Sequence, residues 1–371
     1  MFQKSFEFTE NEDFLSEQII TYLGNKRSLL PFIDTAVAYV KQRLNQKKLR
    51  CADLFSGSGI VARYFKQHAS TLYVNDLEQY SQIINHCYLT NQSDIDINLL
   101  QDELTQIHQQ IEATWSPGFI TELYAPKNDE RIKLGERVFF SRRNAIYLDT
   151  TRKILETHTP HHKHLFLAPL LYEASVHNNT SGVFKGFYKN KAGIGCFGGE
   201  GKNALRRILG EITLKLPLFS NFDCDVNINR MDVNQLVHHL PELDLTYLDP
   251  PYNQHPYGAN YFMLNLLVNY QRPEKISSVS GIPIDWNRSQ YNKRPLAKDA
   301  LFDLISSCPS RFVLISYNSE GFISYEDFYT FLNTLGTLRI FEKEYNTFRG
   351  CRNLHARDLH VSEFLFLLER K

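Results

Sequence analysis

The segment Asp249-Pro250-Pro251-Tyr252 combines residue types that can bind and activate an amine. It follows the apolar stretch Leu243 to Leu248, which is typical of a buried strand. Two prolines fix the backbone and cannot donate to a sheet, so the Asp249 carboxylate and the Pro250 carbonyl remain as acceptors. This pair can accept both hydrogens of an NH2 group on an aromatic ring and direct its nitrogen towards an electrophile. A plain Asp-Pro turn would need neither the second proline nor Tyr252, whose ring offers a flat stacking surface.

A second segment has the composition of a nucleotide-binding turn. The run Asp53 to Gly59 ends in Ser56-Gly57-Ser58-Gly59, whose glycines allow a sharp turn and close approach of a ligand to the main chain. Asp76, at the end of the next apolar stretch, is placed to accept hydrogen bonds from ribose hydroxyls. The dinucleotide pattern G-x-G-x-x-G is incomplete because Ala62 takes its third glycine position. The pattern favours an adenosine-like ligand, and an ordinary strand-to-helix turn remains open.

The elements around these segments predict an α/β protein with a Rossmann-like sheet. Strands are expected at 50–55, 71–74, 243–248, 311–316, 338–344 and 364–368, and helices from residue 60, over 79–88 and over 98–114. The alternation is lost between about 90 and 222. We therefore expect two blocks, 1–89 and 223–371, to build one sheet, with 90–222 as an inserted domain.

Composition excludes several classes of protein. The 371 residues are 43% hydrophobic and 22% charged, as in a folded globular chain. No apolar run approaches the ~20 residues of a membrane span, and no secretory signal is visible, so we expect a cytoplasmic protein without a membrane partner. The six cysteines lie far apart, and the cluster His158, His161, His162 and His164 lacks a cysteine or carboxylate partner at typical spacing, so no metal site is predicted.

Positive charge is concentrated in the inserted segment. Residues 126–215 contain 16 Lys plus Arg against 8 Asp plus Glu, although the whole chain has 41 of each. Segregated positive charge is what a phosphate-binding surface requires, and a solvated basic face is the alternative.

Together these segments resemble the D12, or Dam-like, class of adenine-specific DNA methyltransferases. Tyr22-Leu23-Gly24-Asn25-Lys26-Arg27 looks like the opening motif of that family, and 345–360 looks like one of its later motifs. The resemblance implies an S-adenosylmethionine-dependent methyltransferase sheet with an inserted target-recognition domain. It implies that Tyr22 and Lys26 hold the methionine end of the cofactor and that Asp232 contacts its adenine amino group. The implied cofactor-binding set is Tyr22, Lys26, Asp53, Phe55, Gly57, Gly59, Asp76, Asp232 and Asp249, and the catalytic set is Asp249, Pro250, Pro251 and Tyr252.

The glycine-rich stretch 181–201 of the insertion is the candidate DNA contact. Its lysines could approach phosphates, and its aromatics, among them Phe184 and Phe187, could wedge against bases or instead form a small core. We favour DNA contact because loops rich in glycine and lysine make poor cores. The predicted DNA-binding residues are Lys185, Lys189, Lys191, Lys202 and Arg206.

The sequence therefore predicts transfer of a methyl group from S-adenosylmethionine to the N6 of adenine in double-stranded DNA, after the base rotates out of the helix. A restriction-modification system, with a cognate endonuclease as partner, is the expected setting. One alternative is methylation of RNA or of another exocyclic amine. The other is a non-catalytic DNA-binding subunit, for which an intact Asp249 to Tyr252 segment is unexpected.

Overall fold

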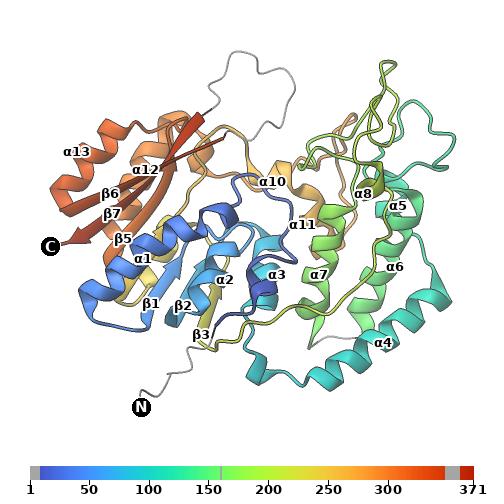
Figure 1. Cartoon of the computed structure of the whole chain (residues 1–371). Helices are drawn as coiled ribbons and strands as arrows, with labels where there is room; N and C mark the ends of the chain where they lie inside the picture. The colour runs from blue at the N-terminus through green and yellow to red at the C-terminus, as the bar shows by residue number, and fades with distance from the viewer. Residues whose placement is uncertain (1–8, 159–160, 347–359) are drawn as a thin grey trace.

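The computed structural model of the chain describes residues 9–158, 161–346 and 360–371. Its centre is a seven-stranded sheet with the order β3-β2-β1-β4-β5-β7-β6 (Figure 1). The strands are β1 (Leu49–Asp53), β2 (Ala69–Asn75), β3 (Asp225–Asn229), β4 (Leu243–Leu248), β5 (Ser310–Asn318), β6 (Gly336–Asn346) and β7 (His360–Arg370). β1 to β5 pair in parallel, whereas β7 runs antiparallel to both β5 and β6. Because parallel strands share an edge for their carboxyl ends, the residues that follow β1, β2, β3 and β4 meet at one rim.

The prediction of a mixed α/β fold is confirmed, and the strands of the sheet lie within residues 49–75 and 225–370. All six expected strands are present, although most are a few residues longer than predicted. β3 was missed. Its sequence, Asp-Val-Asn-Ile-Asn, has no continuous apolar run because it is an edge strand whose residues are half-buried or exposed.

The helices are α1 (Leu30–Leu44), α2 (Ile60–Lys66), α3 (Gln79–Tyr88), α4 (Ile97–Thr114), α5 (Phe119–Tyr124), α6 (Arg142–His158), α7 (Lys163–Val176), α8 (Leu205–Ile208), α9 (Val233–Leu236), α10 (Tyr257–Asn260), α11 (Phe262–Asn269), α12 (Arg294–Ser307) and α13 (Tyr325–Leu335). The predictions for α3 and α4 agree with these bounds to within one residue.

Alternating strand residues build a core on each face of the sheet. Residues such as Leu245 and Leu314 pack with α1 and α2, whereas Leu248 and Ile315 pack with α12 and α13. This two-sided burial explains why the central strands read as continuous apolar runs. It also holds the strand ends rigidly at the rim.

A third core joins the predicted insertion to the sheet domain. It contains Leu104 of α4, Leu148 of α6 and Leu170 of α7 together with Ile84 of α3 and Leu264 of α11. In Figure 1 the helices α4 to α7 lie to one side of the sheet. The division at residues 90 and 222 stays a prediction, because α3 and α11 share this core although they lie outside those limits.

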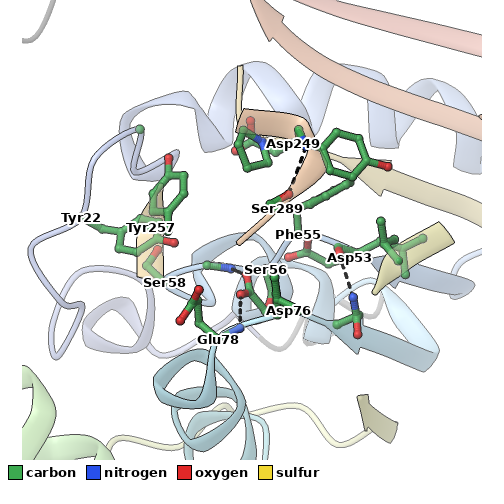
Figure 2. Close-up of a pocket in the computed structure, with 18 of the residues that line it drawn as sticks. Tyr22, Asp53, Phe55, Ser56, Ser58, Asp76, Glu78, Asp249, Tyr257 and Ser289 are labelled. Atoms are coloured by element: carbon green, nitrogen blue, oxygen red, sulfur yellow. Dashed lines mark hydrogen bonds between the residues drawn. The ribbon is translucent and has the colours of Figure 1, made fainter. Parts of the chain in front are cut away.

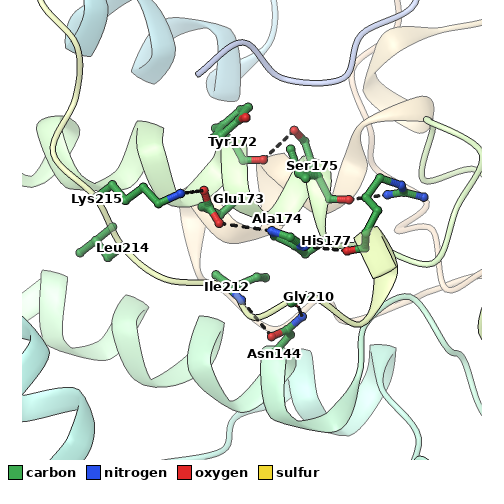
Figure 3. Close-up of polar contacts among 12 residues, drawn as sticks. Asn144, Tyr172, Glu173, Ala174, Ser175, His177, Gly210, Ile212, Leu214 and Lys215 are labelled. Carbon is green, nitrogen blue, oxygen red and sulfur yellow. Dashed lines mark hydrogen bonds and ion pairs between the residues drawn. The ribbon is translucent and has the colours of Figure 1, made fainter. Parts of the chain in front are cut away.

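The chain returns from this helical unit through residues 205–216, which are held by polar contacts to α7 and α6 (Figure 3). Glu173 accepts from Lys215 Nζ at 3.1 Å, and its other carboxylate oxygen lies 3.5 Å from His177 Nε2. Asn144 donates to the Gly210 carbonyl at 2.8 Å and accepts from the Ile212 amide at 3.1 Å. The segment that follows the glycine-rich stretch is therefore fixed against α6 and α7. Within the described residues, every helix is too short or too polar to cross a membrane.

Candidate functional site

A cavity of about 910 Å³, including its open mouth, lies at the carboxyl rim of the sheet (Figure 2). The ends of β1, β2 and β4, the segment after β3, the Tyr22 to Lys26 loop and α10 all contribute to its wall. Most predicted cofactor-binding residues line it: Tyr22, Lys26, Asp53, Phe55, Gly57, Asp76, Asp232 and Asp249. Pro251 also lines it, whereas Gly59, Pro250 and Tyr252 are not among the lining residues. Positions more than 200 residues apart in sequence thus form one site.

The glycine turn between β1 and α2 is tight, as expected. Gly57 has φ +52° and Gly59 has φ +77°, a region that favours glycine. A Cβ atom on Gly57 would lie 2.8 Å from Cε1 of Tyr22, and one on Gly59 would lie 2.9 Å from Oδ1 of Asn85. The first glycine therefore lets the Tyr22 loop close over the turn, and the second lets α2 begin against α3.

Two acidic side chains follow β2. Asp76 accepts hydrogen bonds from the amide of Gly57 at 2.8 Å and from the amide of Glu78 at 2.9 Å, so it fixes the glycine turn from the cavity wall (Figure 2). Glu78 accepts from the side chains of Asn265 at 2.6 Å and Asn287 at 3.1 Å. Burial raises the pKa of Glu78 to about 7 despite these donors. Sequence analysis missed Glu78, because it lies two residues beyond the acid that ends the strand pattern.

Asp53 ends β1 with a buried carboxyl group. Burial, with the nearby Asp249 and Asp76 carboxylates, raises its pKa well above the usual range. The amides of Phe55 and Ala62 lie near enough to favour the charged form, but no group among the described residues meets either oxygen in hydrogen-bonding geometry. Such a group is suited to a donor supplied by a ligand.

Asp232 follows β3 and caps the short helix α9. Its carboxylate accepts from the amide of Asn234 at 2.9 Å, and the Asn234 side chain in turn accepts from the Tyr291 hydroxyl at 2.6 Å. The Tyr291 ring meets Phe55 edge to face, with centroids 5.0 Å apart. Asp232 and Phe55 therefore lie on one wall of the cavity, and Tyr291 was not anticipated.

Asp249 lies directly after β4 and points into the cavity (Figure 2). Pro250 is buried, and the Tyr252 ring packs edge to face on Tyr317 with centroids 6.1 Å apart. The Tyr252 carbonyl accepts from the Phe322 amide at 3.1 Å. These contacts hold the Asp249 to Tyr252 segment in one conformation at the rim.

Lys26 contacts Asp249 directly. Its Nζ lies 3.2 Å from Asp249 Oδ1 and 2.6 Å from Glu363 Oε1 of β7, and Glu363 also accepts from the Ser316 hydroxyl. Burial raises the pKa of Asp249 to about 7, because Lys26 offsets the burial only in part and Glu363 adds negative charge. Glu363 was not anticipated from the sequence. It lies 337 positions from Lys26 and immediately precedes an apolar stretch that we read only as a strand.

Tyr22 belongs to an aromatic stack that closes one end of the cavity. Its ring lies parallel to Tyr257 at 5.0 Å and to Tyr261 at 4.8 Å. Tyr257 and Tyr261 also hydrogen-bond the main chain of Leu23, at 3.2 and 2.7 Å. The opening motif is thereby fixed against α10, just after the Asp249 to Tyr252 segment.

The predicted DNA-binding side chains all project from the glycine-rich stretch and α8, and all are exposed: Lys185, Lys189, Lys191, Lys202 and Arg206. Lys191 lies 3.8 Å from Glu200, and Lys189 Nζ lies 4.9 Å from the centre of the Phe187 ring. The Phe184 amide donates to the Asn260 carbonyl at 2.7 Å, so this stretch meets α10 beside the cavity.

The expectation that Phe184 wedges against DNA bases is wrong. Phe184 is only 2% exposed and packs with Phe139 and Phe140 in the third core, and Phe187 meets Phe139 edge to face. The glycines and lysines of the stretch suggested that it has no core, but Phe184 is buried against the neighbouring helical unit.

The described histidines of the cluster at 158–164 do not line the cavity. Among the described histidines, His162 pairs with Glu103 at 2.9 Å and His164 meets His86 edge to face. Of the late motif at 345–360, residues 347–359 lie outside the described residues.

Comparison with known proteins agrees with this site. A family model described as D12 class N6 adenine-specific DNA methyltransferase matches residues 22–279. The chain is 28% identical over 361 residues to the type II methyltransferase M.NlaIII of Neisseria lactamica, covering 95% of this chain and 99% of that protein. It is 27% identical over 363 residues to the type II methyltransferase M.CviAII of Paramecium bursaria Chlorella virus 1, covering 94% and 98%. The modification methylase StsI of Streptococcus sanguinis is 27% identical over 365 residues, covering 94% of this chain and 52% of that protein. Because the family match spans more than half of its length, the chain belongs to the D12 class of N6 adenine-specific DNA methyltransferases.

Proposed function

We propose that the protein is the modification enzyme of a type II restriction-modification system and methylates adenine N6 within one double-stranded DNA sequence. The observation that carries the proposal is the shared cavity, which brings the glycine turn, Asp76 and Asp232 within one site with Asp249. A ligand that contacts the glycine turn, Asp76 and Asp232 would have one end beside Asp249, the acceptor for the target amine.

The cavity fits S-adenosylmethionine, the methyl donor of the family. The buried carboxyl group of Asp53, which lacks a protein hydrogen-bond donor among the described residues, suits the ammonium group of the methionine end. Asp76 and Asp232 offer acceptors for ribose and adenine donors, and Tyr22 and Phe55 offer apolar walls. When bound, this cofactor supplies a methyl group on a sulfonium sulfur, which keeps the electron pair of the broken bond.

Asp249 and the Pro250 carbonyl would hold the target amine. Together they accept its two hydrogens and orient the nitrogen lone pair, while Tyr252 supports the purine ring. The nitrogen becomes acidic as it gains the methyl group, and Asp249 then accepts its proton and releases it to water. Since its pKa is about 7, Asp249 is ionised at the start of this step above neutral pH.

The target base must leave the duplex to reach Asp249, because N6 is paired inside the helix. The five exposed basic residues of the glycine-rich stretch and α8 would bind the flanking phosphates. Their stretch meets α10 at Asn260, beside the cavity, so a duplex held there would lie next to the acceptor pair.

The restriction-modification setting rests on the relatives. Two are named type II methyltransferases and one a modification methylase, and the first two match along nearly their whole lengths. We infer that a cognate endonuclease cuts the same sequence when it is unmethylated, and that both act in the cytoplasm.

The test is methylation of defined substrates. Purified protein with isotope-labelled S-adenosylmethionine and duplex DNA of mixed sequence should produce N6-methyladenine within one short sequence, read by nucleoside analysis and sequencing. Structured RNA in the same tube should stay unlabelled. Label in RNA or on another base would overturn the proposal, and binding of DNA without any label would favour a non-catalytic subunit.

A further inference from the structure

Glu363 is a buried acid outside every motif described above. It lies in β7, the strand inserted antiparallel between β5 and β6, and its side chain has 0% exposure. Its carboxylate receives Lys26 Nζ at 2.6 Å and the hydroxyl of Ser316 from β5. Burying a carboxylate is costly unless it is paired, so a buried acid beside a catalytic group needs a reason.

Lys26 connects Glu363 to the acceptor pair. The Lys26 side chain is 5% exposed, and its ammonium lies 3.2 Å from Asp249 Oδ1, while the shorter contact is to Glu363. One oxygen of Asp249 is thereby held by Lys26, which leaves the other oxygen for the target amine. The position of Lys26, and with it that of Asp249, depends on where β7 places Glu363.

We propose that Glu363 is a positioning residue for methyl transfer, holding the Lys26 ammonium so that its single positive charge is shared between two carboxylates. This inference rests on the proposed function, in which Asp249 accepts the hydrogens of the target amine.

The charge balance explains what such sharing would do. Asp249 and Glu363 carry two negative charges when ionised, against the one positive charge of Lys26, so the cluster has an excess negative charge. The attacked nitrogen becomes positively charged as it gains the methyl group, and it would complete the balance. This charge leaves the sulfonium sulfur and comes to lie beside the acceptor pair, so the excess negative charge of the cluster stabilises the transition state more than the bound substrate.

The ionisation of Asp249 depends on groups from several elements. The groups that interact with Asp249 are Lys26 from the opening loop, Asp53 from β1, Tyr247 from β4, Tyr257 from α10 and Glu363 from β7, and Tyr252 interacts with Lys26. If the Glu363 carboxylate were removed, Asp249 would be the one acid left in contact with the Lys26 ammonium among the described residues. Without it, Asp249 should ionise at lower pH and become a weaker acceptor for the proton.

The test is Glu363→Gln, which keeps the shape and still leaves Lys26 paired with Asp249. At saturating cofactor and DNA we expect kcat to fall roughly ten- to a hundredfold. We also expect the acid limb of the kcat profile to move to lower pH by roughly one unit. The affinity for S-adenosylmethionine, measured by calorimetry, should stay within about twofold of the wild type. In the absence of turnover, the 13C resonance of the Asp249 carboxyl should titrate at a lower pH than in the wild type. The shift of this titration and that of the acid limb should both have the size expected for the loss of one neighbouring charge.

The matched control is Glu369→Gln. Glu369 lies near the other end of β7, where it pairs with Arg43 and Arg311 away from the cavity. This variant should match the wild type in kcat, pH profile and cofactor affinity.

An active wild type together with an unchanged kcat and acid limb in Glu363→Gln would overturn this inference alone. A wild type that transfers no methyl group to DNA would overturn the proposed function. If Glu363→Gln does not fold, Glu363→Asp is the deciding variant, because it keeps the charge and withdraws the carboxylate. It should retain the acid limb and lose roughly tenfold in kcat, and an unchanged kcat would overturn the inference.

Discussion

The cavity and the glycine-rich stretch hold their charged side chains in opposite ways. In the cavity, Asp53, Asp76 and Asp249 lie at the carboxyl ends of adjacent parallel strands and are fixed by burial, amides or Lys26. In the stretch 181–201 the backbone is fixed instead, since Asn179 accepts from the Gly198 amide at 2.9 Å and Asn190 from the Ile194 amide at 3.0 Å. Its lysines extend into solvent, and the Lys191 side chain is 92% exposed.

This difference follows from what each region must do. Transfer of a methyl group tolerates little displacement of the reacting atoms, whereas attraction to a phosphate decays gradually and is screened by salt. Variants of the cavity should therefore change kcat or cofactor affinity, and variants of the stretch should change DNA affinity and its salt dependence.

The largest effect should come from Asp249→Asn, which removes the proton acceptor while the fold and cavity remain. We expect kcat to fall by about 10³-fold, the middle of the range for general base and charge-stabilising groups. Single-turnover methylation measures this loss, and calorimetry should show that cofactor still binds. Asp244→Asn is the control, because Asp244 lies near the other end of β4 and binds the Arg50 amide at 2.7 Å. Equal loss in both variants would contradict the separation of the cavity from the rest of the sheet.

Gly57→Ala should weaken cofactor binding by about a hundredfold, since a 1 Å displacement at such a site can cost that much. The new methyl group would push Tyr22 away from the turn and strain a backbone with φ +52°. Calorimetry with S-adenosylmethionine measures the effect. Gly135→Ala is the control, because Gly135 has φ +91° but open space around it, so it isolates backbone strain. Wild-type affinity in Gly57→Ala would show that the Tyr22 loop can move freely.

Replacing Lys185, Lys189 and Lys202 by alanine should weaken DNA binding by roughly ten- to thirtyfold at moderate salt. The slope of log affinity against log salt should fall by about 2.7, or ~0.9 for each phosphate that is no longer neutralised. Fluorescence anisotropy at several salt concentrations measures both, and kcat at saturating DNA should not change. Lys47→Ala is the control, because Lys47 is exposed and lies just before β1, at the amino ends of the parallel strands. This variant should keep the wild-type DNA affinity and salt slope. If the salt slope of the triple variant is unchanged, DNA binds to another surface of the protein.

Acidification should lower kcat through Asp249. Its pKa is raised to about 7, so the ionised, accepting form prevails above pH 7 and is lost as the pH falls. The rate at pH 6 should be about a tenth of that at pH 8, because one pH unit below a pKa leaves about a tenth of the group ionised. Steady-state rates with both substrates saturating measure this. The affinity of the glycine-rich stretch for DNA should change little over this range, because lysine and arginine stay charged.

Sequence reasoning identified the parts of the fold and cavity that depend on local patterns. The central strands and the Gly57 turn were visible because burial on both faces demands apolar runs and positive φ demands glycine. Asp249 was visible for the same reason, as it directly follows such a strand.

The remaining parts depend on contacts between distant segments. β3 is a polar edge strand, and Glu363 matters only because β7 brings it to Lys26. Phe184 lies in the third core, although the glycines and lysines around it in the sequence give no sign of this burial. Such positions carry no local signal, because packing across the chain decides their role.

The insertion of β7 between β5 and β6 also bears on how the enzyme matures. Lys26 and Glu363 are separated by 337 positions, so a ribosome must add all of the intervening residues before the Lys26 ammonium can contact Glu363. A nascent chain could assemble the glycine turn and the Asp249 segment early. Its amine-binding pocket would still lack the Glu363 carboxylate until β7 pairs with β5. Methylation competence should thus arise only after β7 has joined the sheet.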